Sequence, residues 1–160
     1  MSLNSASLID PHVQSRLILD ETIKILKAER GFLFLSEAPG KPPRLAVGRD
    51  AQRNELAPQT TYSSTVVEQV GKSGNPVIIS GTEQGELLGA ESVVINDLRS
   101  IMATPLAIAD RPCGVLYVDS RIAKGLFKND DFKLLQALAN HIALSLETAR
   151  AAENELKRQT

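Results

Sequence analysis

The clearest pattern of apolar and polar positions lies in the last third of the chain. Between Asp131 and Lys157 there is no glycine or proline, and apolar residues recur every three or four positions. This spacing is typical of a long α-helix with a buried side. The apolar positions form two stripes. The first is predicted to face a sheet and contains Leu134, Ala137, Leu138 and Ala143; the second has the alternating spacing of a coiled-coil seam and contains Leu135, Leu138, Ile142, Ser145, Ala149, Ala152 and Leu156.

A helix that is apolar on two sides needs two partners. One is its own domain, and we expect the other to be the same helix in a second copy of the chain, because so weak a seam is unstable alone in water. The predicted dimer interface consists of Leu135, Leu138, Ile142, Ser145, Ala149 and Ala152. The alternative is an ordinary terminal helix with a frayed, solvated end from Glu153 to Thr160.

Shorter elements are predicted upstream of this helix. An amphipathic helix spans Asp10 to Glu29, with Pro11 at its first turn and Gly31 as its breaker, and a second helix starts at Ser63 or Ser64 and ends at Gly71 or Gly74. Two hairpins follow from turn residues between apolar runs. The predicted strands are Gly31 to Leu35, Arg44 to Gly48, Pro76 to Ser80, Ile101 to Ala109 and Cys113 to Asp119.

The strands of the last hairpin are apolar on both faces, which an antiparallel sheet with one wet face would not be. We therefore expect the terminal helices on one face and the irregular segment from Asp50 to Arg99 on the other, called the far face below. A pocket is predicted there. Its candidate ligand-binding residues are Phe34 and Val47 as walls, Ser92, Asp97 and Thr104 as hydrogen-bonding groups, and Tyr117 as a stacking or polar group; packed core is the competing interpretation of each.

Composition narrows the class of protein. A chain of 160 residues with 42% hydrophobic content forms one domain without metals or disulfides. Lys and Arg (18) nearly balance Asp and Glu (19), so no nucleic-acid footprint stands out. No apolar run reaches the roughly 18 residues of a membrane span, and a single cysteine, Cys113, fits the cytoplasm. We expect residues 1–9 to be a tag, disordered or a helical leader, 10–150 the domain, and 151–160 a helical linker.

Several runs resemble the GAF domain. They are Leu98 to Leu106, Gly114 to Asp119, and Phe127 followed four residues later by Asp131 and the terminal helix, with Ala28 to Leu33 and Gly74 to Val77 as early landmarks. The resemblance implies an α+β fold related to PAS and profilin: a six-stranded antiparallel sheet with the N- and C-terminal helices on one face and loops or short helices on the other. It also implies a small-molecule-sensing regulatory domain of a bacterial signalling protein.

The family's known ligand motifs are incomplete in this chain. Phe127 and Asp131 match part of the cyclic-nucleotide motif, but Phe132 replaces its Glu, so a cyclic nucleotide is a minor alternative. Cys113 begins a strand beside a turn, which argues against an attached bilin, and one cysteine cannot complete a reductase cycle. His12 and His141 have no partner at ligand spacing, so we predict no metal site and no catalytic residues.

We conclude from the sequence that the chain is a non-catalytic sensory or regulatory domain of a cytoplasmic signal-transduction protein. It is expected to bind an unidentified small molecule, to form a homodimer through its terminal helices, and to control a fused output domain, with no nucleic-acid or membrane partner. The alternatives are a pure dimerisation module without ligand and a small redox enzyme of the same fold. The sequence identifies no cofactor.

Overall fold

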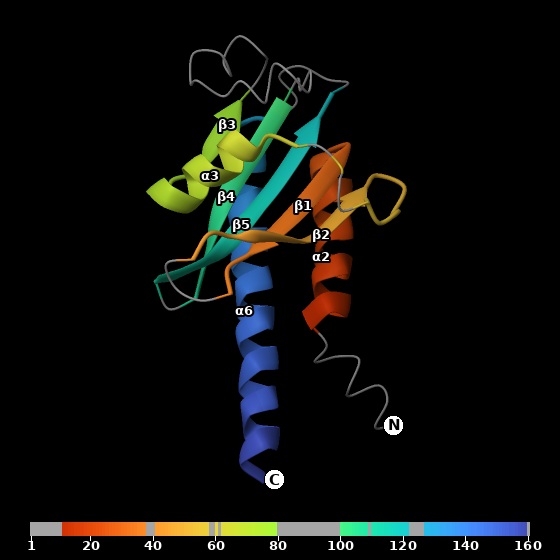
Figure 1. Ribbon diagram of the computed structural model, residues 1–160. Coiled ribbons are helices and arrows are strands. Elements are labelled where there is room, and N and C mark those ends of the chain that lie inside the picture. The colour runs from red at the N-terminus through yellow and green to blue at the C-terminus, as the bar shows by residue number, and fades with distance from the viewer. Residues whose placement is uncertain are drawn as a thin grey trace.

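The computed structural model describes residues 11–37, 41–57, 60, 62–79, 100–108, 110–121 and 127–159. These residues form one antiparallel sheet, with α2 and α6 on one face and α3 on the other (Figure 1). The strand order is β2-β1-β5-β4-β3. The elements are α2 (Pro11–Leu26), β1 (Arg30–Leu35), β2 (Arg44–Asp50), α3 (Ser64–Ser73), β3 (Val77–Ile79), β4 (Ser100–Ile108), β5 (Arg111–Ser120) and α6 (Asn129–Gln159). The predicted α+β architecture is confirmed, with five strands in the described part where six were expected.

The sheet is buried on both faces because each face carries its own core. The helix-side core joins α2 and α6 to the strands through Leu19, Ile23, Leu33, Val47, Met102, Leu116, Leu135 and Ile142, among others. The far-face core joins α3 to the strands through Phe32, Phe34, Val66, Val67, Val70, Ile79, Ile101, Ala103, Val115 and Tyr117. The predicted cover on the far face therefore includes a regular helix, whose three valines face the sheet.

The first helix ends earlier than the sequence predicted. It stops at Leu26, and Lys27 takes the left-handed conformation with φ 58°, so no glycine terminates it. Gly31 instead lies in β1, where an added Cβ would stand 2.9 Å from Cγ1 of Ile23. The glycine thus allows α2 to approach the sheet closely.

A β-bulge in β2 corrects the predicted position of Val47. Leu33 pairs with Val47 and Phe34 pairs with Leu45, so Ala46 is an extra residue in the ladder. Leu45 consequently packs on the far-face core and Val47 on the helix-side core. Val47 cannot be a wall of a far-face pocket.

The two stripes of α6 lie about one residue around the helix from their predicted positions, although Ala143 is buried and Leu138 packs on the helix-side core as predicted. Leu135 and Ile142 are fully buried within the chain, and Leu138 packs against the same helix-side core. They face the sheet, so Leu135 and Ile142 are not available to a second copy. Leu134 and Ala137, predicted to face the sheet, are exposed. The exposed residues with three-four spacing are Leu134, Ala137, His141, Leu144, Thr148 and Ala151, called the outer stripe below.

Of the other predicted interface residues, Ser145 is half-buried, while the side chains of Ala149 and Ala152 lie outside the described part. None of the described helices has the length and apolarity that a membrane crossing would require.

Candidate functional site

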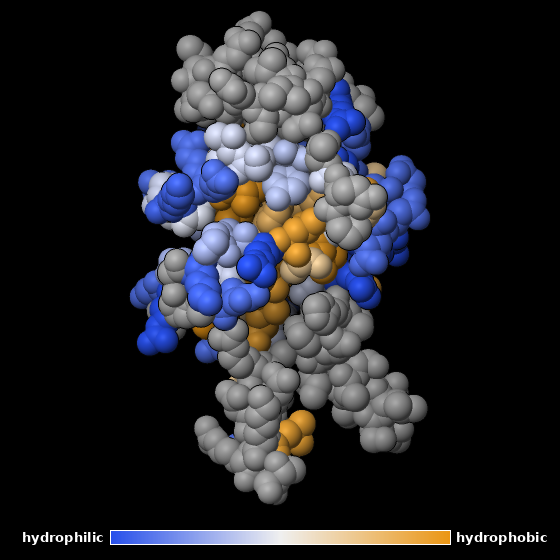
Figure 2. Space-filling view, viewed as in Figure 1, coloured by the Kyte–Doolittle hydropathy of each residue, from blue (hydrophilic) through white to orange (hydrophobic). Residues whose placement is uncertain are grey.

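The far face carries a cavity of about 630 Å³ between α3, the β1–β2 loop and the start of β5. Figure 2 shows hydrophobic residues gathered over the strands beside α3, with hydrophilic residues around them. A cavity of this size falls within the range of sites for small organic ligands. The residues that line it are Ser36, Lys41, Pro42, Pro43, Tyr62, Ser64, Val67, Glu68, Gly71, Lys72, Pro112 and Gly114.

Local sequence places α3 at this cavity. Ser63 is its N-cap residue, and Gly74 ends it in the left-handed conformation with φ 70°, its N–H bonded to the carbonyl oxygen of Val70. Gly71 lies opposite the β1–β2 loop, where an added Cβ would be 3.4 Å from Cγ of Pro43. At Gly71 the helix therefore presents its backbone, without a side chain, to the prolines of the loop.

Tyr62 lines the cavity, and a cluster of aromatic side chains on the sheet forms the wall behind it. The chain has four phenylalanines, two tyrosines and no tryptophan, and four of these six side chains gather in one cluster. Tyr62 lies 4.9 Å from Phe34 and 5.4 Å from Phe32 between ring centroids, and Tyr117 lies 5.5 Å from Phe32. Tyr62 is half-buried and the other three are buried. Tyr62 is thus the aromatic ring that a bound molecule would contact.

Behind this wall lies a buried polar network. The Arg30 guanidinium donates two hydrogen bonds to the Asp119 carboxylate, at 2.9 and 2.7 Å. The Tyr117 hydroxyl donates to the same carboxylate at 2.6 Å and accepts the backbone N–H of Ser63 at 3.1 Å. Arg30 also lies over the Phe32 ring, 5.2 Å from its centroid. This network ties β1, β5 and the start of α3 together.

The polar side chains of this network bond to one another, so they serve the protein's structure and not the recognition of a ligand. The Asp119 side chain is fully buried and that of Arg30 is 8% exposed, and burial, together with the charge of Asp119, raises the pKa of Tyr117 well above its ordinary value. Tyr117 is therefore a neutral hydrogen-bond donor at every physiological pH. Because its hydroxyl both donates and accepts within the protein, it acts as a structural group.

Charged side chains line the cavity: Lys41 comes from the loop, and Glu68 and Lys72 come from α3. All three are exposed. Burial, followed by the charge of Glu68, raises the pKa of Tyr62. The described lining thus offers two ammonium groups and one carboxylate around an apolar, aromatic centre.

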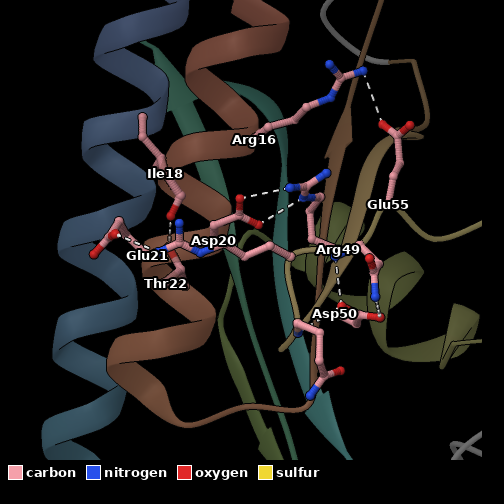
Figure 3. Close-up of polar contacts among 11 residues, drawn as sticks. Arg16, Ile18, Asp20, Glu21, Thr22, Arg49, Asp50 and Glu55 are labelled. Carbon is pink, nitrogen blue, oxygen red and sulfur yellow. Dashed lines mark hydrogen bonds and ion pairs between the residues drawn. The ribbon is translucent and has the colours of Figure 1, made fainter.

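A second polar network fixes α2 to the strand at the sheet edge (Figure 3). Arg49 of β2 donates two hydrogen bonds of 2.9 Å to the Asp20 carboxylate of α2, and these bonds raise the pKa of Arg49. Arg16 pairs with Glu55 at 3.1 Å, and Asp50 accepts the N–H of Asn54 at 2.9 Å. These contacts connect α2 to the segment that leads from β2 toward Tyr62.

The structure brings together two of the six predicted ligand-binding residues. Phe34 and Tyr117 lie on the far face, with ring centroids 6.4 Å apart. Thr104 pairs with Leu116, which belongs to the helix-side core, and so lies with Val47 on the opposite face. Ser92 and Asp97 lie outside the described residues.

The sequence analysis missed the cavity residues of α3 and the β1–β2 loop. The second predicted helix contains the α3 residues of the lining, but the sequence analysis proposed none of them, and no residue between the first two predicted strands, as part of a site. Tyr62 was the residue from which the site could have been found. An aromatic residue directly before the start of a helix often packs against an apolar residue near the beginning of that helix.

Cys113 and His141 are the cysteine and the histidine whose side chains the structure describes, and both residue types can take part in catalysis. Cys113 is a half-buried residue that packs against the helix-side core, while its neighbours Pro112 and Gly114 line the cavity. His141 is exposed on α6. Within the described ranges, no group of three His, Cys, Asp or Glu side chains is placed to hold a metal ion.

The family model of the GAF domain matches residues 10–146. The chain therefore belongs to the GAF domain family. No curated protein matches its sequence.

Several solved structures have the same fold. GAF3 from Slr1393 of Synechocystis sp. PCC6803, in its photoproduct state, is 14% identical with a TM-score of 0.71, covering 87% of this chain and 94% of its own. A GAF domain/HD domain protein from Geobacter sulfurreducens is 13% identical, with a TM-score of 0.66 and coverage of 90% and 96%. The free methionine-R-sulfoxide reductase from Neisseria meningitidis, in complex with its substrate, is 19% identical, with a TM-score of 0.70 and coverage of 90% and 82%.

Proposed function

We propose that this GAF domain is a non-catalytic sensor that binds a small molecule in the cavity beside α3 and controls a fused output domain through α6. The cavity is the observation that carries this proposal. It lies on the far face, whereas α6 packs on the other face of the same sheet, against β4 and β5. A ligand that prefers one position of α3 would shift the populations of the sheet and of the helix packed behind it.

The polar networks support a rigid connection between the two faces. Tyr117 joins the start of α3 to β5, and β5 contacts α6. The Asp20–Arg49 pair joins α2 to β2. Movements of α3 would therefore reach the helix face through the hydrogen bond to Tyr117 and the packing of β5 on α6. Residues 151–160 would then serve as the helical linker to the output domain of a cytoplasmic signalling protein.

We further propose that the domain acts as a homodimer through its helix face. The outer stripe of α6 contributes Leu134 and Leu144, which are 36% and 61% exposed, and α2 contributes Leu17 and Ile25, which are 60% and 45% exposed. A second copy would bury these side chains, and the three-four spacing of the outer stripe suits a helix pair. In this arrangement the dimer contacts lie about 100° around α6 from the seam that the sequence predicted.

Native mass spectrometry of freshly purified protein tests the sensor function. We expect a retained small molecule, and we expect its loss in Val67→Trp, because Val67 lines the cavity and is 5% exposed. Gln136→Trp is the matched control, since Gln136 is exposed on α6. A protein that carries no molecule and gains stability from a filled cavity would favour the pure dimerisation module.

A redox enzyme is the remaining alternative. The Neisseria reductase is similar in fold alone, and Cys113 packs toward the helix-side core, away from the cavity. We expect no methionine sulfoxide reduction by the purified domain. Reductase activity that disappears in Cys113→Ser would overturn the non-catalytic proposal.

A further inference from the structure

We propose that the cavity beside α3 selects planar, largely apolar molecules that carry one negative charge, the chemistry of an aromatic carboxylate. This inference rests on the proposed sensor function and names the ligand class of that site. It is derived from the wall, the size and the charge of the cavity.

The wall of the cavity favours a flat ring. Tyr62 lines the cavity with a half-buried ring that packs beside Phe32, Phe34 and Tyr117, so the exposed part of this ring can contact a guest. Val67 and Pro43 line the same cavity with aliphatic groups. A planar guest can stack against Tyr62 while its edges touch these residues, which adds to the free energy of burying the ring.

The volume sets an upper limit on the size of the guest. A cavity of about 630 Å³ accommodates a fused two-ring molecule with space for a polar substituent. Gly71 contributes no side chain to this space, and the lining prolines are rigid. These residues limit how far this part of the described lining can rearrange around a guest.

The charges favour an anion. Lys41 and Lys72 are the described basic lining residues, and Glu68 is the described acidic one. Glu68 and Lys72 are four residues apart on α3, the spacing at which a glutamate and a lysine neutralise one another in part. One positive charge is left over, and the Ser36 and Ser64 hydroxyls beside the cavity can donate to a carboxylate.

The experiment is an isothermal titration series with three probes that share one ring system and are similar in size: 1-naphthoate, neutral 1-naphthamide and cationic 1-naphthylmethylammonium. The chain has no tryptophan, so naphthalene fluorescence gives an independent readout. We expect naphthoate to bind about tenfold more tightly than the amide and the cation to bind most weakly, with a naphthoate affinity that falls as salt is raised.

Three substitutions assign the effect to the cavity. Lys72→Gln should weaken naphthoate binding about threefold to tenfold and leave amide binding unchanged. Glu68→Gln should strengthen naphthoate binding. Lys133→Gln removes an exposed lysine of α6, on the other face of the sheet, and should change neither. Lys72 and Glu68 are exposed, so these variants should fold, which circular dichroism checks.

The outcomes separate this inference from the sensor function. Equal affinity for all three probes, or an equal effect of Lys72→Gln and Lys133→Gln, would overturn the anion preference. Absence of probe binding in a protein that retains a different molecule, lost in Val67→Trp, would overturn the ligand class and leave the sensor intact. Absence of both probe binding and a retained molecule would overturn the two together.

Discussion

Among the single residues, Asp119 has the most important structural role. Its carboxylate accepts hydrogen bonds from Arg30 and Tyr117 in a site where it is fully buried. A charge removed from water is tolerated only when its partners satisfy it. Removing the carboxylate would take from the buried Arg30 guanidinium the two hydrogen bonds that Asp119 accepts.

We expect Asp119→Ala to lower the free energy of unfolding by about 3–5 kcal/mol, because it breaks a buried pair on one side only. Urea denaturation measures this change. Glu37→Ala is the matched control, since the Arg44–Glu37 pair has side chains that are 77% and 62% exposed. Its loss should change the free energy by less than about 0.5 kcal/mol. Similar effects of the two variants would contradict the structural role of Asp119.

Tyr117 should make the domain sensitive to alkali. Its pKa is raised in the folded state mainly by burial, so the folded protein keeps a proton that the unfolded chain releases above pH 10.0, the ordinary value. The contribution to stability is complete below pH 10.0 and is lost as pH rises from there through the folded-state pKa. We expect the free energy of unfolding to fall with a slope of up to about 1.4 kcal/mol per pH unit from this group.

Tyr117→Phe should remove that slope, although the variant should also be less stable at neutral pH because the Ser63 N–H loses its acceptor. Denaturation curves between pH 9 and 11 compare the slopes. Tyr62→Phe is the control, because Tyr62 is half-buried and its hydroxyl proton contributes less. A wild-type slope retained by Tyr117→Phe would exclude this residue as the cause.

Among the elements, α3 offers two glycines that should respond oppositely to one substitution. Gly74 has φ 70°, which strains any residue with a Cβ, whereas Gly71 is helical and an added Cβ would meet Pro43 at 3.4 and 3.5 Å, ordinary contact distances. We expect Gly74→Ala to destabilise by about 1 kcal/mol and Gly71→Ala to stabilise by about 0.5–1 kcal/mol. Thermal and urea unfolding of both variants would measure the two changes in stability. Changes of equal sign would exclude the described role of Gly74 as the C-cap of α3.

The sequence predicted where elements lie better than which way they face. Apolar periodicity located α3 and α6, and the α3 stop at Gly74 was one of the two predicted. The orientation failed at Val47 and along α6. The face of β2 depends on the bulge at Ala46, which belongs to the pairing with β1 and leaves no mark in the local pattern.

The α6 error has a similar cause. Leu134 and Leu135 are adjacent and equally apolar, so the sequence contains two overlapping stripes about 100° apart. Only the contacts with β4 and α2 select Leu135, Ala139 and Ile142 as the inner stripe. The choice between neighbouring stripes is made by tertiary packing.

For the molecule as a whole, the helix face should control assembly. Leu144 is 61% exposed and lies in the outer stripe, so we expect Leu144→Asp to weaken a homodimer at least about tenfold without unfolding the protomer. Sedimentation equilibrium at micromolar concentration measures this.

Gln136→Asp is the control for assembly, since Gln136 is exposed but lies outside the outer stripe. It should leave the association constant unchanged. Wild-type protein that sediments only as a monomer would overturn the dimer proposal.

The cavity combines segments that no local pattern connects. Tyr62, Lys72 and Lys41 are brought together with the start of β5 because the sheet order places β1 between β2 and β5 and because α3 crosses the far face. Phe34 and Tyr117 were predicted on the correct face, since both are aromatic residues in strands that are apolar throughout. Their role in the wall behind Tyr62 depends on the three-dimensional arrangement.

Apolar spacing, glycines and the position of turns were enough to predict the helices and strands and their two-sided burial, because these depend on neighbours within a few residues along the chain. The family was predicted from the resemblance of the runs Leu98 to Leu106 and Gly114 to Asp119 to the GAF domain. The bulge at Ala46, the inner stripe of α6 and the lining of the cavity arise from contacts between distant segments. Those contacts choose one among several arrangements of nearly equal local free energy, so they are determined by the packing of the whole domain.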